Sequence, residues 1–170
     1  MAKAVKASDV KKDAPPETRG AEGGASTVTT EVKAGEDLPP TDLHVKARKF
    51  LEKFGLTIDH INQLFYKEGT EFKPLYEDLR TTKTAESQIR IALLLALHSG
   101  IRTGEFTFNG ELVREECRIR KCYDPGNFSA NFKNNTAFFE GFDKYDKDNP
   151  VIKLSDAGRK ELADLVKSLQ

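Results

Sequence analysis

The stretch at residues 124–154, DPGNFSANFKNNTAFFEGFDKYDKDNPVIKL, decides the fold that we predict for this chain. Pro125-Gly126 is a strong turn signal, because proline fixes φ and glycine accepts a positive φ. Asn127 follows the turn and belongs to the residue types that cap helices well. We therefore predict a short helix over residues 127–135.

This predicted helix has two different faces. Phe128 and Phe132 are four residues apart, so they share one face, which we expect to be buried. The opposite face carries hydroxyl, amide and amino groups, on Ser129, Asn131, Lys133, Asn134 and Asn135. The pattern predicts a short helix that is anchored by two rings and presents a polar surface.

A β-hairpin is predicted directly after this helix. AFFEGF (137–142) and VIKL (151–154) are rich in aromatic and β-branched residues, as strands are. DKYDKDNP between them has the composition of a loop. The aspartates of this loop, Asp143, Asp146 and Asp148, do not have the spacing of a calcium-binding loop, so we predict a polar tip without a metal site.

Upstream of the turn, GELVREECRIRKC (110–122) has Leu112, Val113, Cys117 and Ile119 at the intervals of an amphipathic helix. The preceding residues 106–108, Phe-Thr-Phe, alternate like a very short strand. After the hairpin, LSDAGRKELADLVKSL (154–169) is expected to run from the last strand into a helix.

Helix, tight turn, helix and hairpin in this order resemble a winged helix-turn-helix domain, over roughly residues 84–170. The most specific local match is Leu154-Ser155 with Gly158-Arg159, a strand-to-helix exit often seen in that superfamily. The resemblance implies a DNA-binding protein, with transcription regulation as a role, that is not an enzyme. The expected fold class is mainly α with a small β-hairpin.

Residues 1–40 are predicted to be a disordered arm. They contain no aromatic residue and are rich in Ala, Gly, Pro, Thr, Lys and Glu, so they cannot bury enough apolar surface to offset chain entropy. They lack a continuous apolar segment, which argues against a targeting peptide.

The longest apolar run of the chain, IALLLAL, is too short to cross a bilayer. We expect a soluble, cytoplasmic protein that does not bind membranes.

Residues 41–83 are predicted to be a helical extension. TDLHVKARKFLEKFG has Thr41 or Asp42 as a cap and Gly55 as a stop. LTIDHINQLFYKEG repeats this pattern, with Thr57 as the cap and Gly69 as the end. The residues expected to face inward are Leu43, Ala47, Phe50, Leu51 and Phe54 in the first helix and Ile58, Ile61, Leu64 and Phe65 in the second. FKPLYEDLR is expected to form a third short helix after Pro74.

AESQIRIALLLALHSG is predicted to be the central helix of the core, because it is apolar on most sides. Thr84 is its expected cap and Gly100 its expected end. The chain carries 27 basic and 27 acidic residues, and from Thr84 onward the counts are thirteen and thirteen. DNA-binding domains are commonly basic, so this neutrality is unusual for one, although local distribution matters more than the sum.

A local basic stripe is the main sign of a nucleic-acid partner. Arg114, Arg118 and Lys121 are spaced by four and three residues, so they should share a helical face. Asparagine pairs well with adenine in the major groove. The candidate residues for binding double-stranded DNA are Arg114, Arg118, Arg120, Lys121, Asn127, Ser129, Asn131, Lys133, Asn134 and Asn135. The flexible arm would add diffuse contacts through its lysines.

Two other interpretations stay open. The arginines could form a solvated face balanced by Glu111, Glu115 and Glu116, with the asparagines as ordinary helix surface. Alternatively, the chain is a protein-interaction module of a larger assembly, docking on a partner or on a second copy through the helices of residues 41–83. Fold alone does not separate this alternative from DNA binding.

The sequence shows no signature of catalysis, of a metal site or of a cofactor. It lacks a glycine-rich phosphate loop, a nucleophile elbow and a histidine-centred cluster. Cys117 and Cys122 are five residues apart, which should place them on different sides of a helix as buried, reduced thiols. Phe138, Phe139 and Phe142 could stack on bases, but we expect two of them to fill the core.

Overall fold

A computed structural model describes residues 35–141 and 150–170. Residues 1–34, which are most of the predicted arm, and residues 142–149, which are the end of the first predicted hairpin strand and most of the predicted tip, lie outside this range. Residues 35–40, the end of the predicted arm, contact the rest of the described chain. Leu38 is buried, and its backbone N–H donates to Asn62 Oδ1 at 2.8 Å. Glu36 forms a β-bridge with Lys67. The prediction of a disordered arm is therefore wrong for these last residues.

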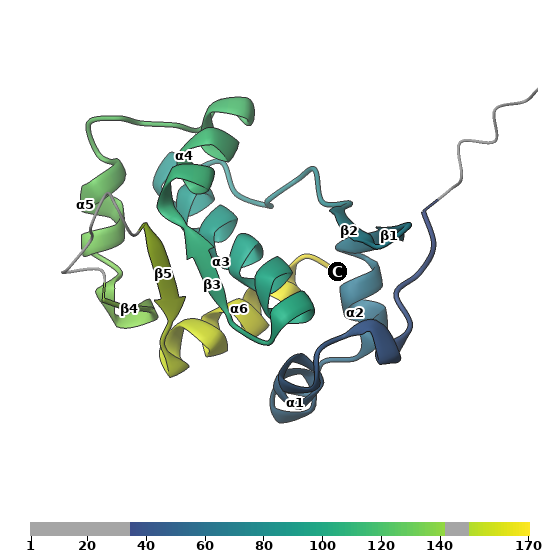
Figure 1. Cartoon of the computed structure of the whole chain (residues 1–170). Coiled ribbons are helices and arrows are strands. Elements are labelled where there is room, and N and C mark those ends of the chain that lie inside the picture. Colours follow the sequence, from purple (N-terminus) through teal and green to yellow (C-terminus); the bar gives the residue numbers. More distant parts are fainter. Residues whose placement is uncertain (1–34, 142–149) are drawn as a thin grey trace, which may run out of the picture. The chain divides into compact units, whose positions relative to one another are not determined.

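The described chain is mainly helical, with two small antiparallel sheets, as Figure 1 shows. Its helices are α1 (Val45–Phe54), α2 (Ile58–Asn62), α3 (Thr84–Thr103), α4 (Gly110–Ile119), α5 (Phe128–Lys133) and α6 (Asp156–Ser168), with short 3-10 turns at Pro40–Asp42 and Thr136–Phe138. Its strands are β1 (Phe65–Glu68), β2 (Glu71–Pro74), β3 (Thr107–Asn109), β4 (Phe139–Glu140) and β5 (Val151–Leu154). The coarse fold class, mainly α with a small hairpin, is confirmed.

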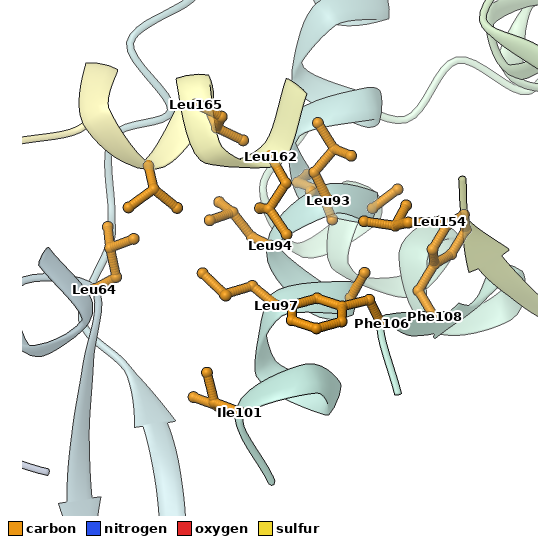
Figure 2. Packing of buried hydrophobic residues seen from close by; sticks show 14 of the residues in the cluster. Leu64, Leu93, Leu94, Leu97, Ile101, Phe106, Phe108, Leu154, Leu162 and Leu165 are labelled. Atoms are coloured by element: carbon orange, nitrogen blue, oxygen red, sulfur yellow. The ribbon is translucent and has the colours of Figure 1, made fainter. Parts of the chain in front are cut away.

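Helix α3 is the centre of the core, as predicted. It packs against α1, α4, α5 and α6, and Leu94 and Leu97 are fully buried. Figure 2 shows Leu162 and Leu165 of α6 gathered with the leucines of α3. An apolar helix that is covered on most sides is what its sequence required.

Both predicted ends of α3 are shifted in the structure. The helix runs through Gly100 to Thr103 and ends on Gly104, whose φ is +77°. A Cβ on Gly100 would lie 2.6 Å from the Phe106 ring, so Gly100 serves packing and does not stop the helix. The N-cap is Lys83 and not Thr84.

Helix α1 is confirmed, and Gly55 ends it in the left-handed conformation with φ +64°. Its start is later than predicted. Thr41 and Asp42 belong to a 3-10 turn, and the cap is His44, whose Nδ1 accepts from the Lys46 backbone N–H at 3.1 Å.

The second half of the predicted helical extension is wrong. Helix α2 ends at Asn62, and β1 and β2 form an antiparallel hairpin that turns at Gly69. Phe65 and Phe72 are buried, whereas Glu68 and Glu71 beside the turn are exposed. No regular element follows Pro74 until α3 begins at Thr84, so the expected third helix is absent from these described residues.

The second sheet has the strand order β3-β5-β4, with all neighbours antiparallel. Phe108 lies opposite Ile152, and Phe139 lies opposite Leu154. The predicted hairpin and the predicted short strand near residues 106–108 are thereby confirmed. None of the helices in the described parts of the chain has the length and apolar character needed to cross a membrane.

Candidate functional site

Helix α5 is held by its two phenylalanines, as the sequence indicated. The Phe128 and Phe132 ring centroids are 4.9 Å apart. Phe132 is 1% exposed, and its ring centroid lies 6.1 Å from that of Phe108 and 5.4 Å from that of Phe139. The side chains of β3 and β4 thus fix the inner face of α5, and the outer face of this helix is exposed.

The turn before α5 is closed by Asp124 and not by Asn127. The Asp124 Oδ1 accepts from the backbone N–H groups of Gly126 at 3.1 Å and Asn127 at 3.2 Å. The Asn127 side-chain amide donates to Asp124 Oδ2 at 2.8 Å, and this bond is the main cause of the lowered pKa of Asp124. Asn127 is the N-cap residue of α5, as predicted, but its own side chain makes no cap bond.

Two of the candidate asparagines are engaged inside the protein. The Asn131 amide donates to Oε1 of the fully buried Gln88 at 2.9 Å. Gln88 in turn donates to the Cys122 carbonyl at 2.9 Å. The Asn135 amide donates to the Asn131 carbonyl at 2.7 Å. Asn131 thus links α5 to α3, and Asn135 is bonded to the backbone of α5. Neither is the free surface residue that we expected.

The remaining polar residues of α5 and its end are exposed. They are Ser129, Lys133 and Asn134. Their side chains take part in none of the side-chain hydrogen bonds or ion pairs between the described residues 35–141 and 150–170. Together with exposed Ala130, they form what we call the α5 outer face.

The arginines of α4 are already paired with its carboxylates. Arg114 bonds Glu111, and its guanidinium carbon lies 4.9 Å from the Phe128 ring centroid. Arg118 lies 3.2 Å from a Glu115 oxygen and stacks on Tyr123 at 4.7 Å. The interpretation of a face balanced by glutamates therefore describes these two pairs, although surface ion pairs of this kind contribute little free energy.

Arg120 has a structural role. Its Nε donates to Glu116 Oε1 at 2.6 Å, and its Nη atoms donate to the carbonyls of Glu77 at 3.0 Å and Tyr76 at 3.2 Å. Its side chain is 19% exposed. Arg120 ties the irregular residues 75–83 to α4, which removes it from the candidate binding set.

Lys121 does not continue the helical face of Arg114 and Arg118, because α4 ends at Ile119. Lys121 takes a left-handed conformation with φ +57°. That reversal lets the Cys122 N–H donate to the Cys117 carbonyl at 2.8 Å. Lys121 is exposed, so it is still available to an anion at the end of α4.

The same reversal brings the two thiols together, so their predicted placement on different sides is wrong. Cys117 and Cys122 are free cysteines, and Cys117 is fully buried. Burial, and then the hydrogen-bonded Cys122 thiol, raise the pKa of Cys117 to about 12. A thiol with such a pKa stays protonated and is a poor nucleophile.

An exposed apolar stripe on α4 is the feature that the sequence interpretation missed. Leu112 and Ile119 were expected to face the core with Val113 and Cys117. They are instead 60% and 67% exposed, while Val113 and Cys117 are buried. Leu112 and Ile119 are seven residues apart and so lie on one side of the helix. A strict count of the helical period around Val113 and Cys117 would have separated the two sets.

The motif at Leu154-Ser155 and Gly158-Arg159 holds the hairpin against α6. Ser155 Oγ accepts from the Gly158 N–H at 3.0 Å and donates to the Ala137 carbonyl. Leu154 is fully buried. This motif sets the position of the hairpin.

No group of three or more His, Cys, Asp or Glu side chains that could hold a metal ion is present among residues 35–141 and 150–170. His98 Nε2 lies 2.8 Å from the Phe72 carbonyl, and burial lowers its pKa.

Searches with the chain match no protein-family model, no curated protein and no solved structure.

Proposed function

We propose that residues 84–170 form a winged helix-turn-helix that binds double-stranded DNA through the α5 outer face, without enzymatic activity. The order of elements supports this proposal. Helices α4 and α5 are joined by the Asp124 turn, and the β4–β5 hairpin follows directly and pairs with β3. Helix-turn-helix proteins place the second of two such helices in the major groove.

The exposure of the α5 outer face carries the proposal. Ser129 and Asn134 offer hydroxyl and amide groups of the kind that contact base edges, and Lys133 offers a charge for a phosphate. The buried Phe128 and Phe132 hold the helix rigidly from below. A short, rigid helix with an exposed polar face is suited to the major groove of DNA.

Arg118 and Lys121 are the best candidates for flanking phosphate contacts. The Arg118 side chain is 53% exposed, and its partner Glu115 is 61% exposed. Because an exposed ion pair is worth about 0–1 kcal/mol, Arg118 can exchange Glu115 for a phosphate at little cost. The revised set is smaller than the one predicted from the sequence: Arg118, Lys121, Ser129, Lys133 and Asn134.

A salt series on duplex DNA tests this site. With few phosphate contacts, we expect weak binding whose logarithm falls linearly with the logarithm of salt, with a slope of about 0.9 per contact. Lys133→Ala should reduce the slope by about one contact, and the Arg118→Ala, Lys121→Ala double variant by about two. Lys160→Ala is the control, because Lys160 is exposed on α6 and pairs with Asp164. Fluorescence anisotropy of a labelled duplex gives both affinity and slope.

Two outcomes would contradict the proposal. Full affinity in the variant that lacks Arg118, Lys121 and Lys133 together would show that the site is elsewhere. Absence of binding by the unmodified chain at about 50 mM salt would show that duplex DNA is not the ligand.

Protein docking is a second candidate function, and the exposed stripe of Leu112 and Ile119 favours it. The docking surface expected from the sequence was formed by the helices of residues 41–83, but Phe50 of α1 is 4% exposed and packs with Phe106 in the core. Helix α4 takes its place as the apolar surface. If docking includes self-association, sedimentation equilibrium of the chain should show a dimer that Leu112→Ser and Ile119→Ser abolish. A monomer at every concentration would remove self-association from this candidate.

A further inference from the structure

The cations of α1 form a row on its exposed side. Lys46, Lys49 and Lys53 are spaced by three and four residues, so they lie along one face. All three are exposed, and the only carboxylate in this helix is Glu52. The row is a concentration of positive charge in a chain whose net charge is zero.

The lysine row borders a cleft of about 390 Å³, which we call the basic cleft. Residues 104–106, β5 and the first turn of α6 form its other sides. The charged side chains that line the cleft are Lys46, Lys49, Lys53, Lys153 and Arg159, with Glu105 as the one carboxylate. A larger cleft of about 560 Å³ is instead lined by charges of both signs, Lys83, Arg90, Glu86, Glu161 and Asp164.

Carboxylates of the described residues balance only part of the positive charge around the basic cleft. Lys46 pairs with Glu105. Outside the lining residues, Lys153 lies 3.3 Å from a Glu140 oxygen, and Arg159 lies 3.9 Å from an Asp156 oxygen.

Within residues 35–141 and 150–170, no carboxylate lies within ion-pair distance of Lys49 or Lys53, so two lysines of the basic cleft are unpaired there. The Lys53 Nζ lies over the Phe54 ring, 5.4 Å from its centroid.

Cations from several sides of the cleft act on the Glu105 carboxylate. The pKa of Glu105 is lowered first by the hydrogen bond and charge of Lys46, and then by the charges of Lys153 and Arg159. These residues come from α1, β5 and α6, so three separate segments act on the same carboxylate. An anion placed in the cleft would be attracted by the same cations, while the Glu105 carboxylate would repel it.

Arg159 lines the cleft with a guanidinium that is partly exposed. Its guanidinium lies 5.5 Å from the Phe106 ring centroid, and 31% of its side chain is exposed. Its Nε is buried and has no hydrogen-bond partner among the described residues. Its one carboxylate partner, Asp156, is at the long distance of 3.9 Å. A guanidinium fixed on a ring in this way is preorganised to hold an oxyanion.

We propose that the basic cleft binds a small ligand that carries two or more phosphate groups. Phosphate oxygens are strong acceptors for ammonium and guanidinium groups, and two unpaired lysines beside Arg159 match more than one negative group. A hollow of this volume lies in the range of small-ligand sites, about 300–1,000 Å³. No residue of α4 or α5 lines it, so the site is separate from the α5 outer face and does not depend on DNA binding.

Calorimetric titration of the full chain with pyrophosphate and tripolyphosphate at low salt tests the proposal. We expect saturable one-site binding. Lys49→Gln with Lys53→Gln should weaken it by at least about tenfold, because two charge-assisted contacts are lost. Arg48→Gln with Lys167→Gln is the matched control, since both residues are exposed, neither lines the cleft and the net charge changes equally. The control should stay within about threefold of the unmodified chain.

Four outcomes would overturn the proposal. Absence of saturable binding by the unmodified chain would remove the site. Equal weakening in the two double variants would show diffuse electrostatics. Orthophosphate binding as tightly as tripolyphosphate would contradict the requirement for two groups. Loss of duplex DNA affinity in the cleft variant, without polyphosphate binding by the unmodified chain, would assign the cleft to a DNA surface.

Discussion

The backbone carbonyl of Phe138 lies directly against Gly158. A Cβ on Gly158 would stand 2.1 Å from the Phe138 oxygen, far inside van der Waals contact. This approach lets the Ser155 N–H donate to the same carbonyl at 2.9 Å, which brings the hairpin onto the start of α6. The glycine in the strand-to-helix motif is thus required by packing against backbone.

Gly158→Ala should therefore destabilise the protein by about 1–3 kcal/mol or more, because the backbone of residue 138 would have to move. The chain has no tryptophan, so urea unfolding is best followed by far-UV circular dichroism. Gly126→Ala is the control. The nearest atom to its Cβ would be Asp124 Oδ1 at 3.5 Å, an ordinary contact, and the change should stay within about 1 kcal/mol. Equal effects of the two substitutions would contradict this role of Gly158.

Phe132→Ala should cost about 3–5 kcal/mol, because a fully buried ring would be replaced by a cavity. The ring contacts Phe108, Phe128 and Phe139. Leu112→Ala removes an apolar side chain that is 60% exposed and should change stability by only about 0.5 kcal/mol. A measured loss below about 1 kcal/mol for Phe132→Ala would be incompatible with the observed burial.

Arg120→Gln should lower the free energy of unfolding by about 1.5–3 kcal/mol, because charge-assisted bonds to Glu116 and to two carbonyls are lost. Arg118→Gln removes the same charge from an exposed pair and should cost less than about 1 kcal/mol. Backbone hydrogen exchange in residues 75–83 should rise in the first variant alone. Similar losses of stability in both variants would show that Arg120 does not hold residues 75–83 against α4.

Alkaline pH should destabilise the protein through Tyr76. Burial raises the pKa of Tyr76 from 10.0 to about 12. Between these pH values the unfolded chain releases a proton that the folded chain keeps, so the free energy of unfolding falls by about 1.4 kcal/mol per pH unit. Below pH 10 this contribution is fully present.

The matching measurement compares urea unfolding at pH 9 and pH 11 in the unmodified chain and in Tyr76→Phe. The variant should lose about 1.4 kcal/mol less over this interval. Cys117, whose pKa is also raised to about 12, contributes equally to both proteins and cancels in the comparison. An identical loss in both proteins would show that the Tyr76 hydroxyl is not buried.

Much of the fold followed from local patterns. Helices α1, α3, α4, α5 and α6 and the β4–β5 hairpin each have apolar residues at the period of the element, with turn residues at their ends. The β1–β2 hairpin did not follow, because apolar residues at 61, 64 and 65 fit a helix as well as a turn followed by a strand. Leu38 was missed because a single apolar residue in a polar segment has no period.

The candidate site was less predictable than the fold. Asn131 and Gln88 are 43 residues apart in sequence and Arg120 and Tyr76 are 44 apart, yet each pair is hydrogen-bonded. Residue type alone cannot separate an asparagine that faces solvent from one that is bonded to a buried glutamine. The same limit applies to the basic cleft, whose cations come from α1, β5 and α6.

By itself, the sequence determined that its most hydrophobic helix would form the core and that two phenylalanines four residues apart would anchor a short helix beside a hairpin. Both are local properties, since they depend on the spacing of side chains along one element. Only the tertiary structure decided which polar groups are free, leaving Ser129, Lys133 and Asn134 exposed while Arg120, Asn131 and Asn135 hold other parts of the chain. The physical reason is that a hydrogen bond or an ion pair belongs to two groups at once, and packing sets the distance between them.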